Sequence, residues 1–172
     1  GQGILSREDR DAASIVEQRM KSDGVSLLCS ARNLQVTGAE GGIRLDVEAG
    51  GESHAQQVDQ LLVAAGRAPN VEGLDLEKVG VQYDVRQGVH VDDRLRTTNK
   101  RIFAAGDICS AFKFTHAADF MARTVIRNAL LPGRAKMSSL VIPWCTYTSP
   151  ELAHVGLLPA DQTEVDTYLQ PM

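Results

Sequence analysis

The sequence lacks an excess of basic residues and any long apolar run. Acidic residues outnumber basic ones, 22 to 18, so the basic stripe expected of a nucleic-acid-binding protein is absent. The apolar runs are too short to cross a bilayer, and the first residues do not form a basic-then-apolar signal sequence. With 43% hydrophobic and 23% charged residues, the composition is that of an ordinary globular chain without nucleic-acid or membrane partners.

Cysteine is also scarce, and its spacing is uninformative for catalysis. Cys29, Cys109 and Cys145 are far apart and form neither a CxxC nor a CxxxxC pair. Three separated thiols favour structural cysteines in a reducing cytoplasm over a disulfide framework or a metal site. The opening residues GQGILS lack the third glycine of a dinucleotide-binding fingerprint, so no complete nucleotide-binding turn is present.

The most informative stretch is TTNKRIFAAGDICS, residues 97–110. Its apolar run Ile102–Ala105 predicts a buried strand that ends at Gly106 and places Asp107 at its carboxyl end. Ligands of open α/β sheets bind beyond these strand ends. An Asp beside a residue without a side chain can approach a sugar or polyol hydroxyl, although a lone Gly-Asp could equally be a capped turn.

A helical pattern follows this stretch, from Thr115 to about Leu131, and Pro132-Gly133 ends it. Strand, turn and helix start together predict a site for a polar or anionic ligand edge. His116, at the helix start, is either a cap residue or a backbone donor to such a ligand.

The remaining pattern predicts one further helix and several strands. The helix is predicted to begin with a cap at Ser6, to carry the acidic residues Glu8 and Asp9 in its first turn, and to stop at Gly24. Continuous apolar runs predict buried strands at 25–29 and 60–65, and alternating patterns predict a meander from 34–36, 43–47 and 54–58. Shorter signals predict a helical turn at 74–80 and strands at 89–91, 141–148 and 152–157.

Two features of these segments could be confused with binding sites. Asp92 and Asp93 could suggest a metal, but neighbouring strand residues face opposite sides, so a solvated pair is the preferred interpretation. GRAPN, residues 66–70, follows a predicted strand and on its own could be a plain turn.

Three stretches together resemble the pyridine nucleotide–disulfide oxidoreductases, a family that includes dihydrolipoyl dehydrogenase and mercuric reductase. They are residues 97–110, LLVAAGRAPN at 61–70 and IPWCTYTSPELAHVGL at 142–157, in the family's order. The resemblance implies an α/β fold: partial FAD- and NAD(P)-binding Rossmann-like domains, an antiparallel β-meander and the start of an α+β dimerisation domain. The implied boundaries are 1–66 for the NAD(P)-binding part, 67–134 for the FAD-binding part and 135–172 for the interface domain.

The resemblance also implies cofactor contacts. Asp107 would hold the ribityl chain of FAD, the helix start at Thr115 and His116 would lie under the flavin ring, and Gly66 would lie close to the nicotinamide nucleotide of NAD(P)H. The full set of implied cofactor-binding residues is Gly66, Gly106, Asp107, Lys113, Phe114, Thr115 and His116.

The family's redox-active cysteine pair and its His-Glu acid–base pair are not found in this chain, so no catalytic residue is assigned. We expect a fragment of an FAD-dependent oxidoreductase that is inactive alone, self-associates, and belongs to a homodimeric parent. The alternative is a non-catalytic nucleotide-binding or interaction module derived from the family. The sequence leaves open the terminal acceptor and the choice between NAD and NADP.

Overall fold

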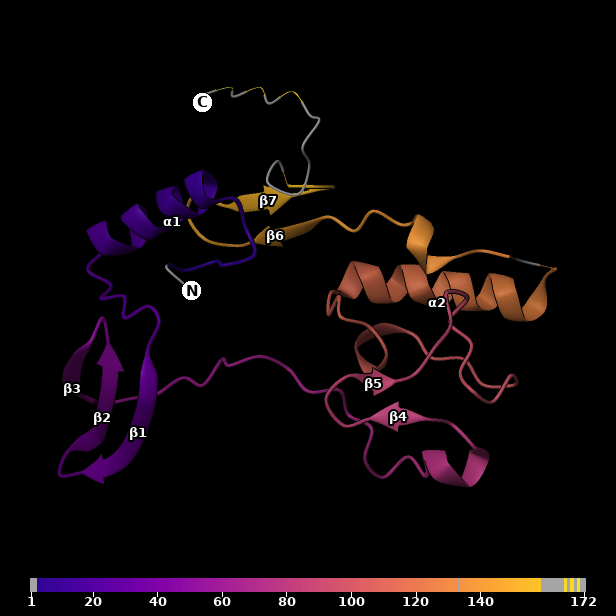
Figure 1. Cartoon of the computed structure of the whole chain (residues 1–172), viewed down its shortest axis with the longest axis horizontal. Coiled ribbons are helices and arrows are strands. Elements are labelled where there is room, and N and C mark those ends of the chain that lie inside the picture. Colours follow the sequence, from indigo (N-terminus) through magenta and orange to yellow (C-terminus); the bar gives the residue numbers. More distant parts are fainter. Residues whose placement is uncertain (1–2, 133, 159–165, 167, 169, 171–172) are drawn as a thin grey trace. The chain divides into compact units, whose positions relative to one another are not determined.

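The computed structural model describes residues 3–132, 134–158, 166, 168 and 170 (Figure 1). The chain forms two compact units, one made of Gly1–Ala64 with Pro143–Met172 and the other of Ala65–Ile142. Within the described part of the chain, no helix combines the length and apolar character needed to cross a membrane.

The first unit contains the helix α1, Arg10–Ser22. Asp9 caps it, because its carboxylate accepts hydrogen bonds from the backbone N–H groups of Asp11 and Ala12. The cap is therefore Asp9 and not Ser6. The helix buries Ala13 and Val16, residues three apart on one face.

The meander is present as predicted and is longer than its apolar pattern suggested. It comprises β1 (Arg32–Ala39), β2 (Gly42–Ala49) and β3 (Glu52–Val58), paired antiparallel in that order. Val36 pairs with Leu45, and Leu45 pairs with Gln56. β1 is exposed over nearly its whole length, so this sheet buries little of its own apolar surface.

A short hairpin completes the first unit. Its strands are β6 (Trp144–Thr146) and β7 (Leu152–His154), where the sequence predicted longer strands at 141–148 and 152–157. Trp144 lies opposite His154 in the antiparallel register. β7 contacts α1, so residues from both ends of the sequence share this unit.

The second unit is built around a small core of Val71, Val81 and Val89. Its regular elements are η1 (Leu76–Val79), β4 (Tyr83–Asp84), β5 (Gly88–Val89), η2 (Gly106–Ile108), α2 (Thr115–Leu130) and η3 (Met137–Ser139). η2 contacts both α2 and β5.

Polar side chains join the loop at Asp93 and Arg94 to α2 and to the residues that follow it. Asp93 accepts hydrogen bonds from the backbone N–H and the hydroxyl of Ser138, each at 2.7 Å. These bonds hold the pKa of the Asp93 carboxyl below its ordinary value. Asn128 of α2 bonds the carbonyls of Arg94 and Ala135.

Three predicted strands are not strands in the structure. Residues 25–29 and 60–65 carry no regular secondary structure, and Leu62 and Val63 are 89% and 76% exposed. Residues 102–105 are extended but form only an isolated bridge, between Phe103 and Arg96. The physical reason is that a strand requires a hydrogen-bonded neighbour, and none of the described residues pairs regularly with these segments.

Gly88 allows two backbone segments to meet. A Cβ at this position would lie 1.9 Å from the carbonyl oxygen of Ile108, and φ is +94°. We expect Gly88→Ala to destabilise the second unit by about 3 kcal/mol or more, because backbone rather than a flexible side chain must move. Urea denaturation followed by circular dichroism measures this.

Gly80→Ala is the matched control. Gly80 also has positive φ, +69°, but nothing lies within 4 Å of its would-be Cβ. Only the left-handed backbone penalty of about 1–2 kcal/mol applies there. Equal losses for the two variants would contradict the role assigned to Gly88.

Candidate cofactor-binding site

The turn at Gly106 is fixed from both sides. The extended residues before it are held to the preceding loop, since Thr97 donates its backbone N–H to Ile102 and Ala104 donates to Leu95. Gly106 has φ +83°, in the region that favours glycine. The chain therefore turns at this residue and presents Asp107 as the next side chain.

Gly106 also brings the turn close to α2. A Cβ there would lie 3.2 Å from the Cβ of Ala118, tighter than ordinary van der Waals contact. Its backbone N–H lies 3.2 Å from the sulfur of Met121, a fully buried residue of the same helix. A glycine at this position thus sets the distance between the turn and the helix.

Asp107 is half-exposed, and its surroundings are basic. One guanidinium nitrogen of Arg67 lies 3.4 Å from the carboxylate oxygen Oδ2. The ammonium of Lys113 donates to the Asp107 carbonyl at 2.7 Å and to the Ser110 carbonyl at 3.2 Å. These two hydrogen bonds from Lys113 hold the loop between η2 and α2 in its conformation. The Asp107 carboxylate remains accessible to a ligand hydroxyl.

Arg67 is a member of the site that the sequence did not indicate. Besides Asp107, its guanidinium donates to the Lys113 carbonyl at 3.4 Å. The neighbouring Gly66 has φ +99° and open space around it. The sequence did contain a signal for this pair. Arg67 directly follows Gly66 at the end of one apolar run, and Asp107, which has the opposite charge, directly follows Gly106 at the end of another.

The start of α2 is open to a ligand. Phe114 occupies the N-cap position, which leaves the helix without a side-chain cap, and the first turn carries no acidic residue. The ring of Phe114 stacks on that of His116 at 5.4 Å between centroids. Thr115 and His116 are exposed. Such a helix start attracts the electron-rich edge of a ligand through its positive dipole end.

The structure thus brings all seven predicted residues into one unit from 65 to 142. Direct contacts link Asp107 to Lys113 and Phe114 to His116. Gly66 joins the group through its neighbour Arg67. The arrangement offers a carboxylate acceptor, two cations and a helix start, which suits a ligand with hydroxyl groups and an anionic edge.

Comparisons with known proteins identify the family. The family model described as pyridine nucleotide-disulphide oxidoreductase matches residues 1–122. The chain belongs to this family.

Curated relatives agree with this assignment. The chain is 32% identical over 155 residues to a mercuric reductase of Bacillus cereus, which covers 90% of the chain and 24% of that protein. It is 32% identical over 153 residues to a dihydrolipoyl dehydrogenase of Geobacillus stearothermophilus, covering 89% of the chain and 32% of that protein. The chain therefore spans about a quarter to a third of the length of these relatives.

Solved structures confirm the predicted fold class. A copper(II) complex of the HOCl-induced flavoprotein disulfide reductase RclA from Escherichia coli superimposes with a TM-score of 0.79 at 29% identity, over 91% of this chain and 36% of that one. LpdA from Mycobacterium tuberculosis superimposes with a TM-score of 0.77 at 29% identity, over 90% of this chain and 33% of that one.

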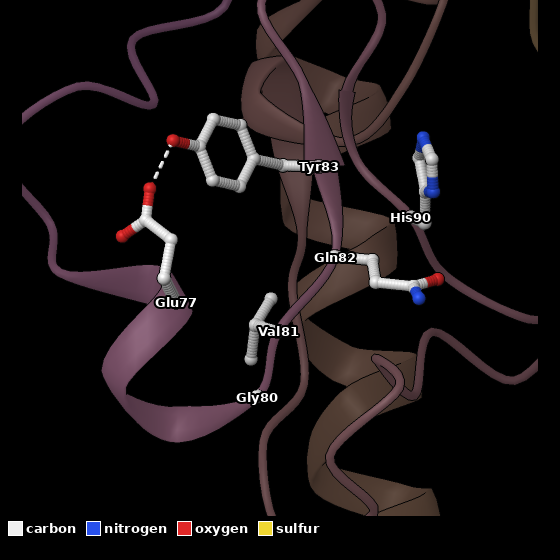
Figure 2. Close-up of a pocket in the computed structure, with 6 residues that line it drawn as sticks. All are labelled: Glu77, Gly80, Val81, Gln82, Tyr83 and His90. Carbon is white, nitrogen blue, oxygen red and sulfur yellow. Dashed lines mark hydrogen bonds between the residues drawn. The ribbon is translucent and has the colours of Figure 1, made fainter.

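A separate cavity lies elsewhere in the second unit of this family member. It has a volume of about 500 Å³ and is lined by Glu77, Gly80, Val81, Gln82, Tyr83 and His90. Figure 2 shows Glu77 and Tyr83 on one side of the strand and Gln82 and His90 on the other, so these side chains do not converge on one ligand. The hydroxyl of Tyr83 donates to the Glu77 carboxylate, which raises the pKa of Tyr83 and lowers that of Glu77.

The two adjacent aspartates have separate protein partners. Asp92 pairs with the guanidinium of Arg96 at 2.7 Å, whereas Asp93 binds Ser138. Among the residues that the structure describes, no three His, Cys, Asp or Glu side chains come together as a metal site.

Cys109 lies two residues after Asp107, but its environment makes it unreactive. It packs against the valine core, and burial raises the pKa of its thiol to about 11, despite the opposing effect of nearby Lys113. All three cysteines are free in the structure. A thiol with so high a pKa carries almost no thiolate at neutral pH, and thiolate is the nucleophile.

We expect Cys109 to resist iodoacetamide at neutral pH and to react only as the pH approaches 11. Because the raised pKa keeps the thiol protonated, its thiolate fraction at pH 7 is about one in ten thousand. The chain is alkylated at a series of increasing pH values, and mass spectrometry of its peptides measures the extent of labelling of each cysteine. Rapid labelling of Cys109 at pH 7 in folded protein would contradict the burial argument.

Proposed function

We propose that the full-length protein containing this chain is an FAD-dependent oxidoreductase that passes electrons from NAD(P)H through FAD to a disulfide or a related acceptor. The observation that carries this is the Gly106–Asp107 turn, packed against the open start of α2 in a member of this family. The relatives are named as enzymes, which favours this function over a non-catalytic module.

The side chains fit a flavin nucleotide in their chemistry. The half-exposed carboxylate of Asp107 can accept a hydrogen bond from a ribityl hydroxyl. The start of α2, with Thr115 and His116, can face the electron-rich edge of the ring system. Lys113 and Phe114 shape the loop between these two groups, and Gly106 keeps that loop close to the helix.

When bound, FAD would supply the redox chemistry, and this chain would supply binding and orientation. Asp107 would fix the ribityl chain, while Arg67 would hold the Asp107 carboxylate in place. Gly66, with no atom near its would-be Cβ, would leave room for the nicotinamide nucleotide. No residue of the chain is assigned a proton-transfer or nucleophilic role.

We propose the same domain limits that the sequence suggested: 1–66 for part of the NAD(P)-binding domain, 67–134 for part of the FAD-binding domain and 135–172 for part of the interface domain. The break between the two compact units at Ala64 and Ala65 supports the first boundary. We also propose that the full-length protein is a cytoplasmic homodimer. The relatives do not distinguish the terminal acceptor, because a mercuric reductase and a dihydrolipoyl dehydrogenase are equally similar to the chain.

Substitution of Asp107 in the full-length protein tests the cofactor assignment. A hydrogen bond to a charged acceptor contributes roughly 1.5–3 kcal/mol. Since 1.4 kcal/mol is tenfold in affinity, we expect Asp107→Ala to weaken FAD binding by about tenfold to a hundredfold. Asp107→Asn keeps an acceptor and should lose less. Flavin retained after dialysis is the measurement.

Cys109→Ser provides the control for this series. It lies two residues from Asp107 and should leave flavin retention nearly unchanged, since its thiol has no assigned contact with the cofactor. If Asp107→Ala keeps its flavin while Cys109→Ser loses it, the site assignment is wrong.

Arg67 should act through Asp107, and a double-mutant cycle in the full-length protein detects this. The ion pair is largely exposed, so we expect Arg67→Ala to weaken FAD binding by only about twofold to fivefold. In the Asp107→Ala background the same change should have no further effect. Additive losses, measured as flavin dissociation constants of the four proteins, would show that Arg67 acts independently.

A further inference from the structure

The ammonium group of Lys113 is held in place by two main-chain carbonyls. Its Nζ donates to the carbonyl oxygen of Asp107 at 2.7 Å and to that of Ser110 at 3.2 Å. The residue is half-buried, so its position is restrained by the loop around it. Carbonyl oxygens orient an ammonium group but leave its unit charge intact. The loop between η2 and α2 therefore carries a fixed positive charge.

The other charges around this loop are paired with each other. The guanidinium of Arg67 lies 3.4 Å from the Asp107 carboxylate. Asp119, one turn into α2, pairs with Arg123 at 2.8 Å, and the first turn of α2 has no acidic residue. Because each of these pairs is neutral as a whole, the charge of Lys113 is in excess at the loop. It adds to the positive end of the α2 dipole.

The electric field of Lys113 acts on at least one other group of the turn. Burial raises the pKa of the Cys109 thiol to about 11, and nearby Lys113 opposes this rise, because a cation favours the thiolate. Cys109 lies two residues after Asp107 and packs against the valine core. An anion that forms next to this loop should be stabilised by the same ammonium group.

The proposed function, on which this inference rests, would create such an anion. Hydride transfer from NAD(P)H leaves NAD(P)⁺ and adds two electrons and one proton to FAD. The reduced cofactor then has one more negative charge than the oxidised cofactor. A fixed cation beside the cofactor binds the reduced form more tightly than the oxidised form, and this difference raises the reduction potential.

We propose that Lys113 favours reduced over oxidised FAD, because it holds an uncompensated positive charge between the Asp107 turn and the start of α2. Asp107 and the helix start bind and orient the cofactor, whereas Lys113 adjusts how readily the cofactor accepts electrons. For one charge near a protein surface, we expect Lys113 to increase the ratio of the two affinities by about threefold to tenfold.

The reduction potential of FAD in the full-length protein tests this proposal. Lys113→Gln removes the charge but keeps N–H donors for the two carbonyls, whereas Lys113→Arg keeps both. We expect Lys113→Gln to lower the potential by up to about 30 mV, since tenfold corresponds to that value for a two-electron couple. Lys113→Arg should keep the original potential. Spectrophotometric titration against a reference dye measures it, and the dissociation constant of oxidised FAD is measured alongside.

Lys113→Met separates the charge from the support that Lys113 gives to the loop. Methionine has neither the charge nor the N–H donors. If the charge acts, Lys113→Met and Lys113→Gln should lower the potential equally. If Lys113 only supports the loop, Lys113→Gln should resemble the unmodified protein, and Lys113→Met should weaken both redox forms alike. That second pattern would overturn the proposal. If either neutral variant fails to fold, the potential of the other decides.

Lys78→Gln is the matched control. Lys78 belongs to the same unit, on η1, and its ammonium lies 2.9 Å from the Asp75 carboxylate. Its loss should leave the potential unchanged. Equal shifts in Lys78→Gln and Lys113→Gln, or an unchanged potential in Lys113→Gln, would contradict the role of Lys113 while FAD binding, and with it the proposed function, stands. A full-length protein that binds no FAD would overturn both.

Discussion

The second unit depends on the close approach of other parts of the chain to the backbone at two glycines. At Gly88 the approaching atom is a carbonyl oxygen of η2, and at Gly106 it is the side chain of Ala118 on α2. Both positions also have positive φ, which other residues adopt only with strain. The candidate site exists because η2 is held from both sides in this way, so Asp107 emerges at a fixed distance from the helix start.

Electrostatics around this turn differ from those of the first unit. The Arg67–Asp107 pair is exposed, so it orients a carboxylate without contributing much stability. In the first unit, the carboxylate of Glu8 and the ring of His154 lie 3.7 Å apart and are buried, so the cost of removing charge from water governs their interaction. An exposed pair such as Arg67 with Asp107 can exchange one partner for a ligand, because both side chains are open to solvent.

The segments at 25–29 and 60–65 illustrate a different constraint. Their continuous apolar character is typical of strands covered on both faces, and the structure leaves much of that surface exposed. Their apolar residues still favour the strand conformation, but a segment becomes part of a sheet only when a second strand pairs with it. The matched region is only about a quarter to a third of the length of the relatives.

The sequence by itself determined the local elements and the family. Helical periodicity and caps predicted α1 and α2, alternation predicted the meander, and three motifs predicted the family that the comparisons confirm. These signals are local, because a helix and a tight hairpin satisfy their hydrogen bonds within a few residues. Gly106 and Asp107 were recognisable for the same reason, as adjacent residues at the end of an apolar run.

Only the tertiary structure decided which distant residues meet. Arg67 lies 40 positions from Asp107, and Glu8, which accepts a hydrogen bond from the indole of Trp144, lies 136 positions from it, so no periodic pattern connects them. The absence of regular strands at 25–29, 60–65 and 102–105 was equally unpredictable, since pairing depends on a neighbour rather than on the segment. The buried thiol of Cys109 and the buried Oε2 of Glu8, which has no hydrogen-bond partner, likewise follow from packing, because desolvation is a property of the folded surroundings.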